Sequence, residues 1–402
     1  MTGVFMKYLI FIISLIVIFI AAASVSFKAG DIKRKCVPII VLLLLEGAVA
    51  YALLHTSAGL AILHTASGGI EYLIYHANKG IDFVFGDITA KKPIIFVIAA
   101  LMPLVFICAV IGILKYFGIL RLIIVTVGYL INKIAKVGKL DSFSAVSAVA
   151  VGMMAVYVSI KEYIPNLTKP QMYTIAACSL STVDIAILGA YTQMISPQFV
   201  IIGVCLNFFS TFVIVSVINP GDPVDIPENF SGVNDERHSF FEVITEHMQD
   251  GFKLILAIVP IILGFIALIS LLNDVFLHIA GISFQGILGY IFSPLAFVLG
   301  VPWEDSIRLG QIIATKVLAN EFVAMIDYIK IDDLSLRTET IMSVFLISFA
   351  NFGSVGMIIG CVSAISKKHG KIIAANTFRL IIGSTLVSCL SATMAGIFAG
   401  QS

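Results

Sequence analysis

The sequence predicts an all-α polytopic membrane protein, with eight transmembrane helices, two re-entrant hairpins in an inverted repeat and two interrupted helices. The first observation is composition: 59% of the 402 residues are hydrophobic and 12% are charged, whereas soluble domains carry about 25% charged residues. The second is a series of apolar runs long enough to cross a bilayer. The third is that the two halves of the chain repeat one order of segments.

Each predicted span is a run of about 20 or more mostly apolar residues. The spans are 8–27, 36–57, 94–118, 170–195, 198–218, 251–273, 338–362 and 372–398. The first run has an alternative interpretation as a signal peptide, because it follows Lys7 and ends in small residues. It is long for the apolar core of a signal peptide and precedes a basic stretch, so we interpret it as a retained helix.

Two apolar stretches do not fit as single spans and are predicted to be hairpins. Residues 140–164 and 304–329 each have a small or polar centre and charged ends. Each has the length of a segment that enters and leaves the membrane on one side. Irregular backbone at membrane depth needs protein or a water-filled cavity around it. We therefore expect both hairpins to pack inside the protein.

Both halves show a span, an amphipathic segment, a hairpin, an interrupted span and a final span. The interruptions are STVD at 181–184 and FANFGS at 349–354, and interrupted helices at matching places are typical of transporters built from repeats. We predict a scaffold of N-terminal transmembrane helices with an interfacial segment, a first repeat, a cytoplasmic loop and a second repeat. These units cover residues 1–90, 91–218, 219–250 and 251–402, and the amphipathic segments are 121–139 and 282–300.

The basic residues predict the orientation. Clusters at 28–35, 133–139, 161–169 and 367–371 all fall on the cytoplasmic side if the N-terminus lies outside. The opening spans of the two repeats then cross in opposite directions, which makes the repeat inverted. Lys91 and Lys92 would lie outside, a small departure from the rule.

Composition also argues against several functions. The formal net charge of +1 gives no reason to expect a nucleic-acid partner. The six cysteines contain no CxxC pair and the seven histidines no HExxH pattern, and no GxxxxGK[ST] loop occurs. Since neither a nucleophile–base pair nor a metal cluster is evident, we do not expect an enzyme or a cofactor.

Glu321, in LANEFVAMID, is the strongest candidate for function. A carboxylate at hairpin depth is costly and marks a functional site by default. The alternative is a carboxylate near the hairpin mouth that pairs with Lys316, but Asn320 and Asn351 add polar groups in the same half of the chain. We therefore favour a binding role for Glu321.

The second interrupted span presents Asn351 and Ser354 three residues apart, so a helical fragment would carry both on one face. A broken helix frees backbone groups to bind a polar ligand. The alternative is close helix packing through small residues such as Gly353. In the first interrupted span, Asp184 is a candidate to bind a proton or a cation, or to pair with a nearby base. Arg379 is interpreted as a structural or snorkelling cation.

Several segments resemble the concentrative nucleoside transporter family. ATKVLANEFVAMID and SFANFGSVGMIIG are similar to its two signature motifs, and GKLDSFSAVSAVAVG, MYTIAACSLSTV and ISFQGILGYIFSPLAFVLGVPWE resemble the bacterial nucleoside permeases. The resemblance covers nearly the whole chain from about residue 90. It implies a homotrimer in a bacterial cytoplasmic membrane, a transport domain that moves like an elevator, and nucleoside uptake driven by a cation gradient.

The resemblance also implies roles for individual residues. Glu321, Asn351 and Ser354 match positions that hydrogen-bond ribose hydroxyls, next to Asn320. Phe349 matches an aromatic residue near the sugar, and Ile187 matches an apolar wall beside the base. Charge-assisted bonds from hydroxyls to a carboxylate are strong, which agrees with a ribose site.

The first hairpin departs from the family pattern. Members usually carry Gly-Gln-Ser/Thr-Glu at its tip, which reads the edge of the base, whereas this chain has Gly152-Met153-Met154-Ala155. Apolar sites discriminate weakly between bases. We therefore expect an altered or broadened substrate, either another base or a ribose-like compound.

The cation site departs as well. Sodium-coupled members carry an asparagine at the position of Ala148, while the Val151 carbonyl, the Thr182 hydroxyl and the Val183 carbonyl correspond to the remaining ligands. We expect proton coupling, with Glu321 or Asp184 as the carrier, although Asp184 is also placed to restore a sodium ligand. The predicted function is cation-coupled secondary active transport of nucleosides. The alternatives are a carrier of another riboside, a facilitator, or a nutrient sensor that binds without transport.

Overall fold

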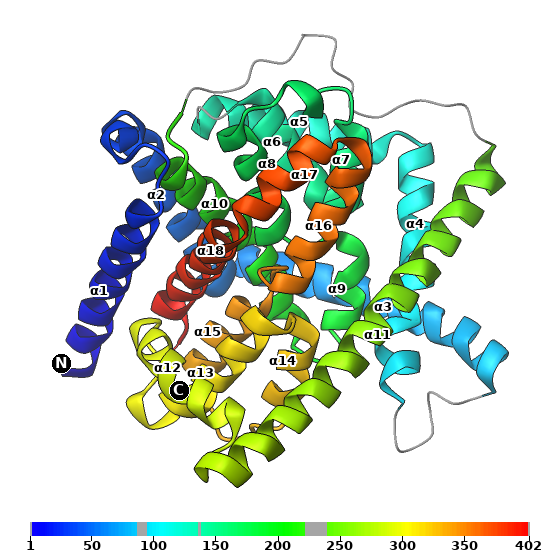
Figure 1. Ribbon diagram of the computed structural model, residues 1–402. Helices are drawn as coiled ribbons and strands as arrows, with labels where there is room; N and C mark the ends of the chain where they lie inside the picture. The colour runs from blue at the N-terminus through cyan, green and yellow to red at the C-terminus, as the bar shows by residue number, and fades with distance from the viewer. Residues whose placement is uncertain (1, 87–94, 136–137, 222–238, 401–402) are drawn as a thin grey trace.

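The computed structural model describes residues 2–86, 95–135, 138–221 and 239–400. Within these ranges the chain forms helices and short connections, without a β-strand. Figure 1 shows the helices gathered into one body, with the N- and C-termini at the same end. The expected all-α membrane fold is confirmed.

The N-terminal part consists of helices that pack against the rest of the chain. They are α1 (Thr2–Ser24), η1 (Ala29–Lys35), α2 (Cys36–His55) and α3 (Ser57–Phe85). Helix α1 contacts the C-terminal helix, where Lys7 Nζ donates to the Ala399 carbonyl at 3.0 Å. Helix α2 contacts the first repeat, where Ser210 Oγ donates to Glu46 Oε1 at 2.5 Å.

The first repeat contains the first hairpin and the first interrupted helix. Its elements are the π-helix η3 (Val97–Leu101), α4 (Pro103–Tyr116), α5 (Ile119–Ala135), α6 (Lys139–Val151), α7 (Met153–Ser159), η4 (Ile164–Asn166), α8 (Lys169–Ser181), α9 (Ile185–Tyr191) and α10 (Pro197–Ile218). The hairpin reverses at Gly152, whose φ of 95° is open to glycine but strained for other residues.

The second repeat follows the same order. Its elements are α11 (Phe240–Ala280), α12 (Phe284–Val298), α13 (Trp303–Leu318), α14 (Glu321–Tyr328), α15 (Leu336–Leu346), α16 (Phe352–Ile365), α17 (Lys367–Ala375) and α18 (Thr377–Phe398). Helix α11 begins earlier than predicted, because Ser239 caps it by accepting from Glu242 N at 3.3 Å. Residues 240–250 of the predicted loop are therefore helical, and residues 222–238 lie outside the described ranges.

The predicted spans correspond to helices, with one difference. Among the described residues seven helices are long and apolar enough to cross a membrane. The remaining predicted span, 338–362, is divided between α15 and α16, so neither half reaches that length. Helices α12 and α13 are bent by 115° against each other, and this bend separates the predicted amphipathic segment from the second hairpin.

Both predicted interruptions occur. Helix α8 ends at Ser181 and α9 starts at Ile185, while α15 ends at Leu346 and α16 starts at Phe352. Figure 1 shows α6 and α7 of the first hairpin at one end of the molecule and α13 and α14 of the second at the other end. The tips of hairpins that enter from opposite ends meet the two breaks in the interior, and this meeting point holds the site.

Candidate functional site

A cavity of about 440 Å³ lies where the hairpin tips meet the interrupted helices. Four helices, α7, α9, α14 and α16, begin at its wall, and each brings residues of its first turn or cap to the lining. Helices α4 and α11 close another side of the cavity. Elements from both repeats therefore build one site.

Three of these helix starts are capped by the residues that the sequence singled out. Asp184 Oδ1 accepts from Ile187 N at 3.0 Å, and Asn320 Oδ1 accepts from Val323 N at 2.9 Å. Asn351 Oδ1 accepts from Ser354 N at 2.7 Å. A side-chain oxygen at this position satisfies one of the free N–H groups of a new helix. The same side chains thus fix these helix starts and line the cavity.

Glu321 is held from two sides. Its Oε1 accepts from the Tyr191 hydroxyl at 2.9 Å, and its Oε2 accepts from Asn351 Nδ2 at 2.8 Å. The residue is 4% exposed and still lines the cavity. The two bonds join the second hairpin to both interrupted helices and fix the direction of the carboxylate.

Lys316 does not hydrogen-bond to Glu321, so the structure does not bear out that alternative. Its Nζ donates to the Phe345 carbonyl, to Ser348 Oγ at 2.7 Å and to Ser388 Oγ at 3.1 Å. The ammonium also lies 4.3 Å from the centre of the Phe345 ring. This buried cation therefore joins α13 to α15, to the break that follows α15 and to α18.

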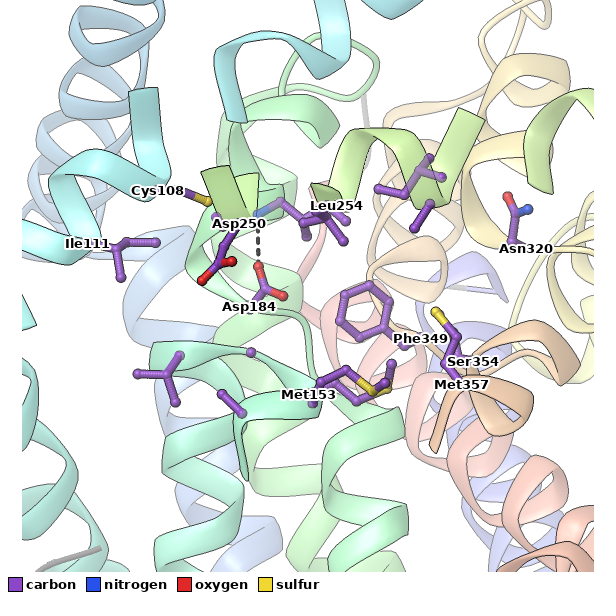
Figure 2. Close-up of a pocket in the computed structure, with 18 of the residues that line it drawn as sticks. Cys108, Ile111, Met153, Asp184, Asp250, Leu254, Asn320, Phe349, Ser354 and Met357 are labelled. Carbon is purple, nitrogen blue, oxygen red and sulfur yellow. Dashed lines mark hydrogen bonds between the residues drawn. The ribbon is translucent and has the colours of Figure 1, made fainter. Parts of the chain in front are cut away.

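The wall between the polar groups is apolar. Phe349 and Met153 are 7% and 6% exposed, and Figure 2 shows both side chains in the middle of the cavity. The other apolar lining residues include Val151, Met154, Ala155, Ile187, Leu254, Ile258, Ile261 and Met357. Such a lining suits a flat, weakly polar group.

The candidate cation ligands do not all reach this cavity. Val151 and Asp184 line it, whereas Thr182 and Val183 are buried and do not line it. The Thr182 hydroxyl donates to the Cys178 carbonyl at 3.0 Å. Among the described residues no group of three or more His, Cys, Asp or Glu side chains is arranged to hold a metal ion.

Several residues of the site were not predicted from the sequence. Tyr191 lies four residues after Ile187, hence on the same helix face, and this spacing was the available signal. Helices α4 and α11 add a polar end with Lys115, Glu246, His247 and Asp250. Lys115 belongs to a segment whose pattern indicated only membrane crossing, and the other three belong to the predicted loop 219–250, so nothing in the local pattern placed them at a cavity.

The fold and the site define a membrane transporter: interrupted helices from two repeats surround a central cavity that has polar groups fixed at its wall. Comparisons with known proteins agree. Residues 13–88 match the family profile described as "Na+ dependent nucleoside transporter N-terminus", and residues 199–396 match the one for the C-terminus. The chain is 32% identical to "Purine nucleoside transport protein NupG" of Bacillus subtilis, over 98% of this chain and 100% of that protein.

Further relatives and structures support this result. "Nucleoside permease NupC" of Helicobacter pylori is 26% identical over 97% of each chain. The structure of CNTnw in an inward-facing substrate-bound state has a TM-score of 0.91 at 26% identity, covering 98% of this chain and 99% of that one. A CNTnw variant in an outward-facing state has a TM-score of 0.91 at 25% identity, covering 98% of both chains. The chain belongs to the concentrative nucleoside transporter family, and it is a transporter, not an enzyme.

Proposed function

We propose that this protein is a secondary active transporter that takes up nucleosides across the cytoplasmic membrane. The observation that carries the proposal is the buried Glu321 carboxylate, fixed by Tyr191 and Asn351 at the wall of the cavity. Ribose offers neighbouring hydroxyl donors, and charge-assisted bonds to a carboxylate are strong. The cavity volume of about 440 Å³ lies in the range of small-molecule sites.

Glu321 can accept further hydrogen bonds from a sugar, although each of its oxygens already accepts one. A carboxylate has about four lone-pair sites, and Tyr191 and Asn351 use two of them. Two ribose hydroxyls are therefore able to donate to the same carboxylate. Ser354 and Asn320 also line the cavity and add polar partners at this end.

Uptake of labelled adenosine and uridine tests the proposal, in cells that lack their own nucleoside transporters. We expect the protein to accumulate at least one of them and Glu321→Gln to abolish uptake. The glutamine keeps the size of the side chain but offers fewer acceptor sites to the sugar. No uptake by a well-folded protein at the membrane would contradict the proposal.

We propose that coupling uses protons in preference to sodium. Ala148 stands where sodium-coupled members carry an asparagine, so one oxygen ligand is missing, and Glu321 and Asp184 are the candidate proton carriers at the cavity. The matched profiles are described as Na+ dependent, which keeps sodium as the alternative. Uptake that rises at acidic pH without sodium supports proton coupling, and uptake that needs sodium and ignores pH contradicts it.

We further propose an elevator-type mechanism in a homotrimer with the N-terminus outside. The cavity continues along α4 and α11 to Lys115 and Glu246, at the molecular end where the basic segment α17 also lies (Figure 1). If this end is cytoplasmic, the structure faces inward. The N-terminal helices would form the scaffold, and the exposed Tyr72 and Tyr75 of α3 are available for contacts between subunits. Native mass spectrometry showing only monomers would contradict the trimer.

The apolar tip Met153-Met154 supports a second candidate, a member that carries another riboside or binds without active transport. Accumulation against a gradient separates these functions, because a facilitator or a sensor does not concentrate its ligand. Collapse of uptake on addition of an ionophore would identify the active transporter.

A further inference from the structure

We propose that the Asp184 carboxylate recognises the base of the bound nucleoside and selects bases that carry an exocyclic amino group. This inference rests on the nucleoside transport proposed above and deepens it. The hairpin tip offers Met153, Met154 and Ala155, whose side chains make no ordinary hydrogen bond to a base. The polar group that recognises the base would then lie at the start of α9 and not on the hairpin.

The layout of the cavity matches the shape of a nucleoside. Glu321, Asn351 and Ser354 line the cavity as one hydrogen-bonded group, and Asp184, Phe349 and Met153 line it as well. Figure 2 shows Asp184 on one side of Phe349 and Ser354 on the other. A nucleoside has the same arrangement: a polar sugar, flat apolar ring faces and a polar outer edge.

The Asp184 carboxylate lies against the tip of the first hairpin. A Cβ atom built on Gly152 would lie 3.1 Å from Asp184 Oδ2, so this oxygen sits directly beside the bare glycine. Gly152, Met153 and Asp184 all line the cavity. Asp184 therefore places a carboxylate beside the hairpin tip, which carries no charged side chain of its own.

Asp184 also retains capacity to accept a bond from a ligand. Its Oδ1 accepts from Ile187 N at 3.0 Å, but a carboxylate has about four lone-pair sites. Among the described residues no Lys, Arg or His forms a salt bridge with it. The neighbouring Asp250 differs, since it is exposed and pairs with Lys253 at 2.9 Å.

This chemistry predicts which bases bind. An ionised carboxylate only accepts, so it attracts the N–H groups of an amino substituent and repels a carbonyl oxygen at the same place. A site that binds a donor rejects the analogue that lacks it, because the acceptor then loses its partner. Bases with amino groups are thus favoured over otherwise identical bases without them.

The experiment measures equilibrium binding to the purified full-length protein with two ligand pairs that each differ by one amino group. Adenosine is compared with purine riboside, and guanosine with inosine. The matched variant is Asp184→Asn, since asparagine caps a helix as well as aspartate does but adds an N–H₂ donor. We expect the wild type to prefer the amino ligand about tenfold in at least one pair, and Asp184→Asn to lose that preference.

A preference in the wild type that falls to about threefold or less in Asp184→Asn supports the proposal. No preference in either pair, or an equal preference in both proteins, overturns it. If Asp184→Asn does not fold, Asp184→Ser provides another good cap without the carboxylate and is judged by the same ratios. Failure of the wild type to bind any of the four nucleosides would instead overturn the proposed function.

Discussion

Glu321 depends on Tyr191 for its orientation, which makes this tyrosine a positioning residue of the proposed ribose site. The hydroxyl bonds to Oε1 at 2.9 Å, and the ring contacts Phe322 with centroids 5.2 Å apart. Tyr191→Phe keeps the ring and removes only the hydroxyl. Because a hydrogen bond to a charged group contributes about 1.5–3 kcal/mol, we expect riboside binding to weaken about tenfold or more.

Equilibrium binding of adenosine to the purified variant checks this expectation, with circular dichroism to verify the fold. Tyr129→Phe is a matched control, since Tyr129 is exposed on α5 and does not line the cavity. Affinity of Tyr191→Phe equal to that of the control would show that Asn351 alone suffices to orient Glu321.

At the scale of elements, the first hairpin depends on Gly152. Its φ of 95° is disfavoured for residues with a Cβ atom, and that atom would meet Asp184 Oδ2 at 3.1 Å. We expect Gly152→Ala to reduce uptake of all nucleosides, because the hairpin tip must shift. Gly356→Ala is the control, since nothing lies within 4 Å of a Cβ added there. Equal uptake by both variants would contradict the account.

The second hairpin depends on the buried Lys316, which binds the last turn of α15 through Phe345 and the following break through Ser348. Lys316→Met keeps the length of the side chain and leaves these acceptors without their cation, so we expect stability to fall by about 1–3 kcal/mol. Thermal unfolding in detergent measures the change. Lys330→Met at the outer end of the hairpin removes only the pair between an exposed lysine and the half-buried Asp327, so it should alter stability little. If Lys316→Met and this control unfold at the same midpoint temperature, the proposed stabilising role of Lys316 is wrong.

Local sequence pattern was enough to predict most elements and part of the site. The lengths of the apolar runs predicted the spans. Glu321 and Asn351 stood out because polar groups at membrane depth are energetically costly and therefore indicate function. Tyr191 did not stand out, since its bond to Glu321 joins residues 130 positions apart. Lys316 was weighed as a partner of the nearby Glu321, but its partners came from α15, the following break and α18. The partners of Tyr191 and Lys316 depend on contacts between segments that are far apart in the sequence, and local pattern does not predict such contacts.

At the scale of the whole molecule, the predicted orientation places Cys36 at the cytoplasmic end of its span. This cysteine begins α2 after the basic stretch and is exposed. A membrane-impermeant thiol reagent applied to intact cells should leave Cys36 unmodified and should label it after the cells are opened. Mass spectrometry of the Cys36 peptide gives the readout. Lys330→Cys on the opposite side provides the control and should react in intact cells, whereas labelling of Cys36 in those cells would reverse the orientation.

The central claim is that Glu321 and Asn351 bind a nucleoside through its ribose hydroxyls. The most direct measurement is the affinity of the purified protein for adenosine and uridine, each compared with its 2′-deoxy and 3′-deoxy analogues, in the wild type and in Glu321→Gln. We expect each missing hydroxyl to weaken binding to the wild type about tenfold or more, and Glu321→Gln to bind no nucleoside with wild-type affinity. Equal affinity for the ribosides and their deoxy analogues, or unchanged binding by Glu321→Gln, would contradict this account.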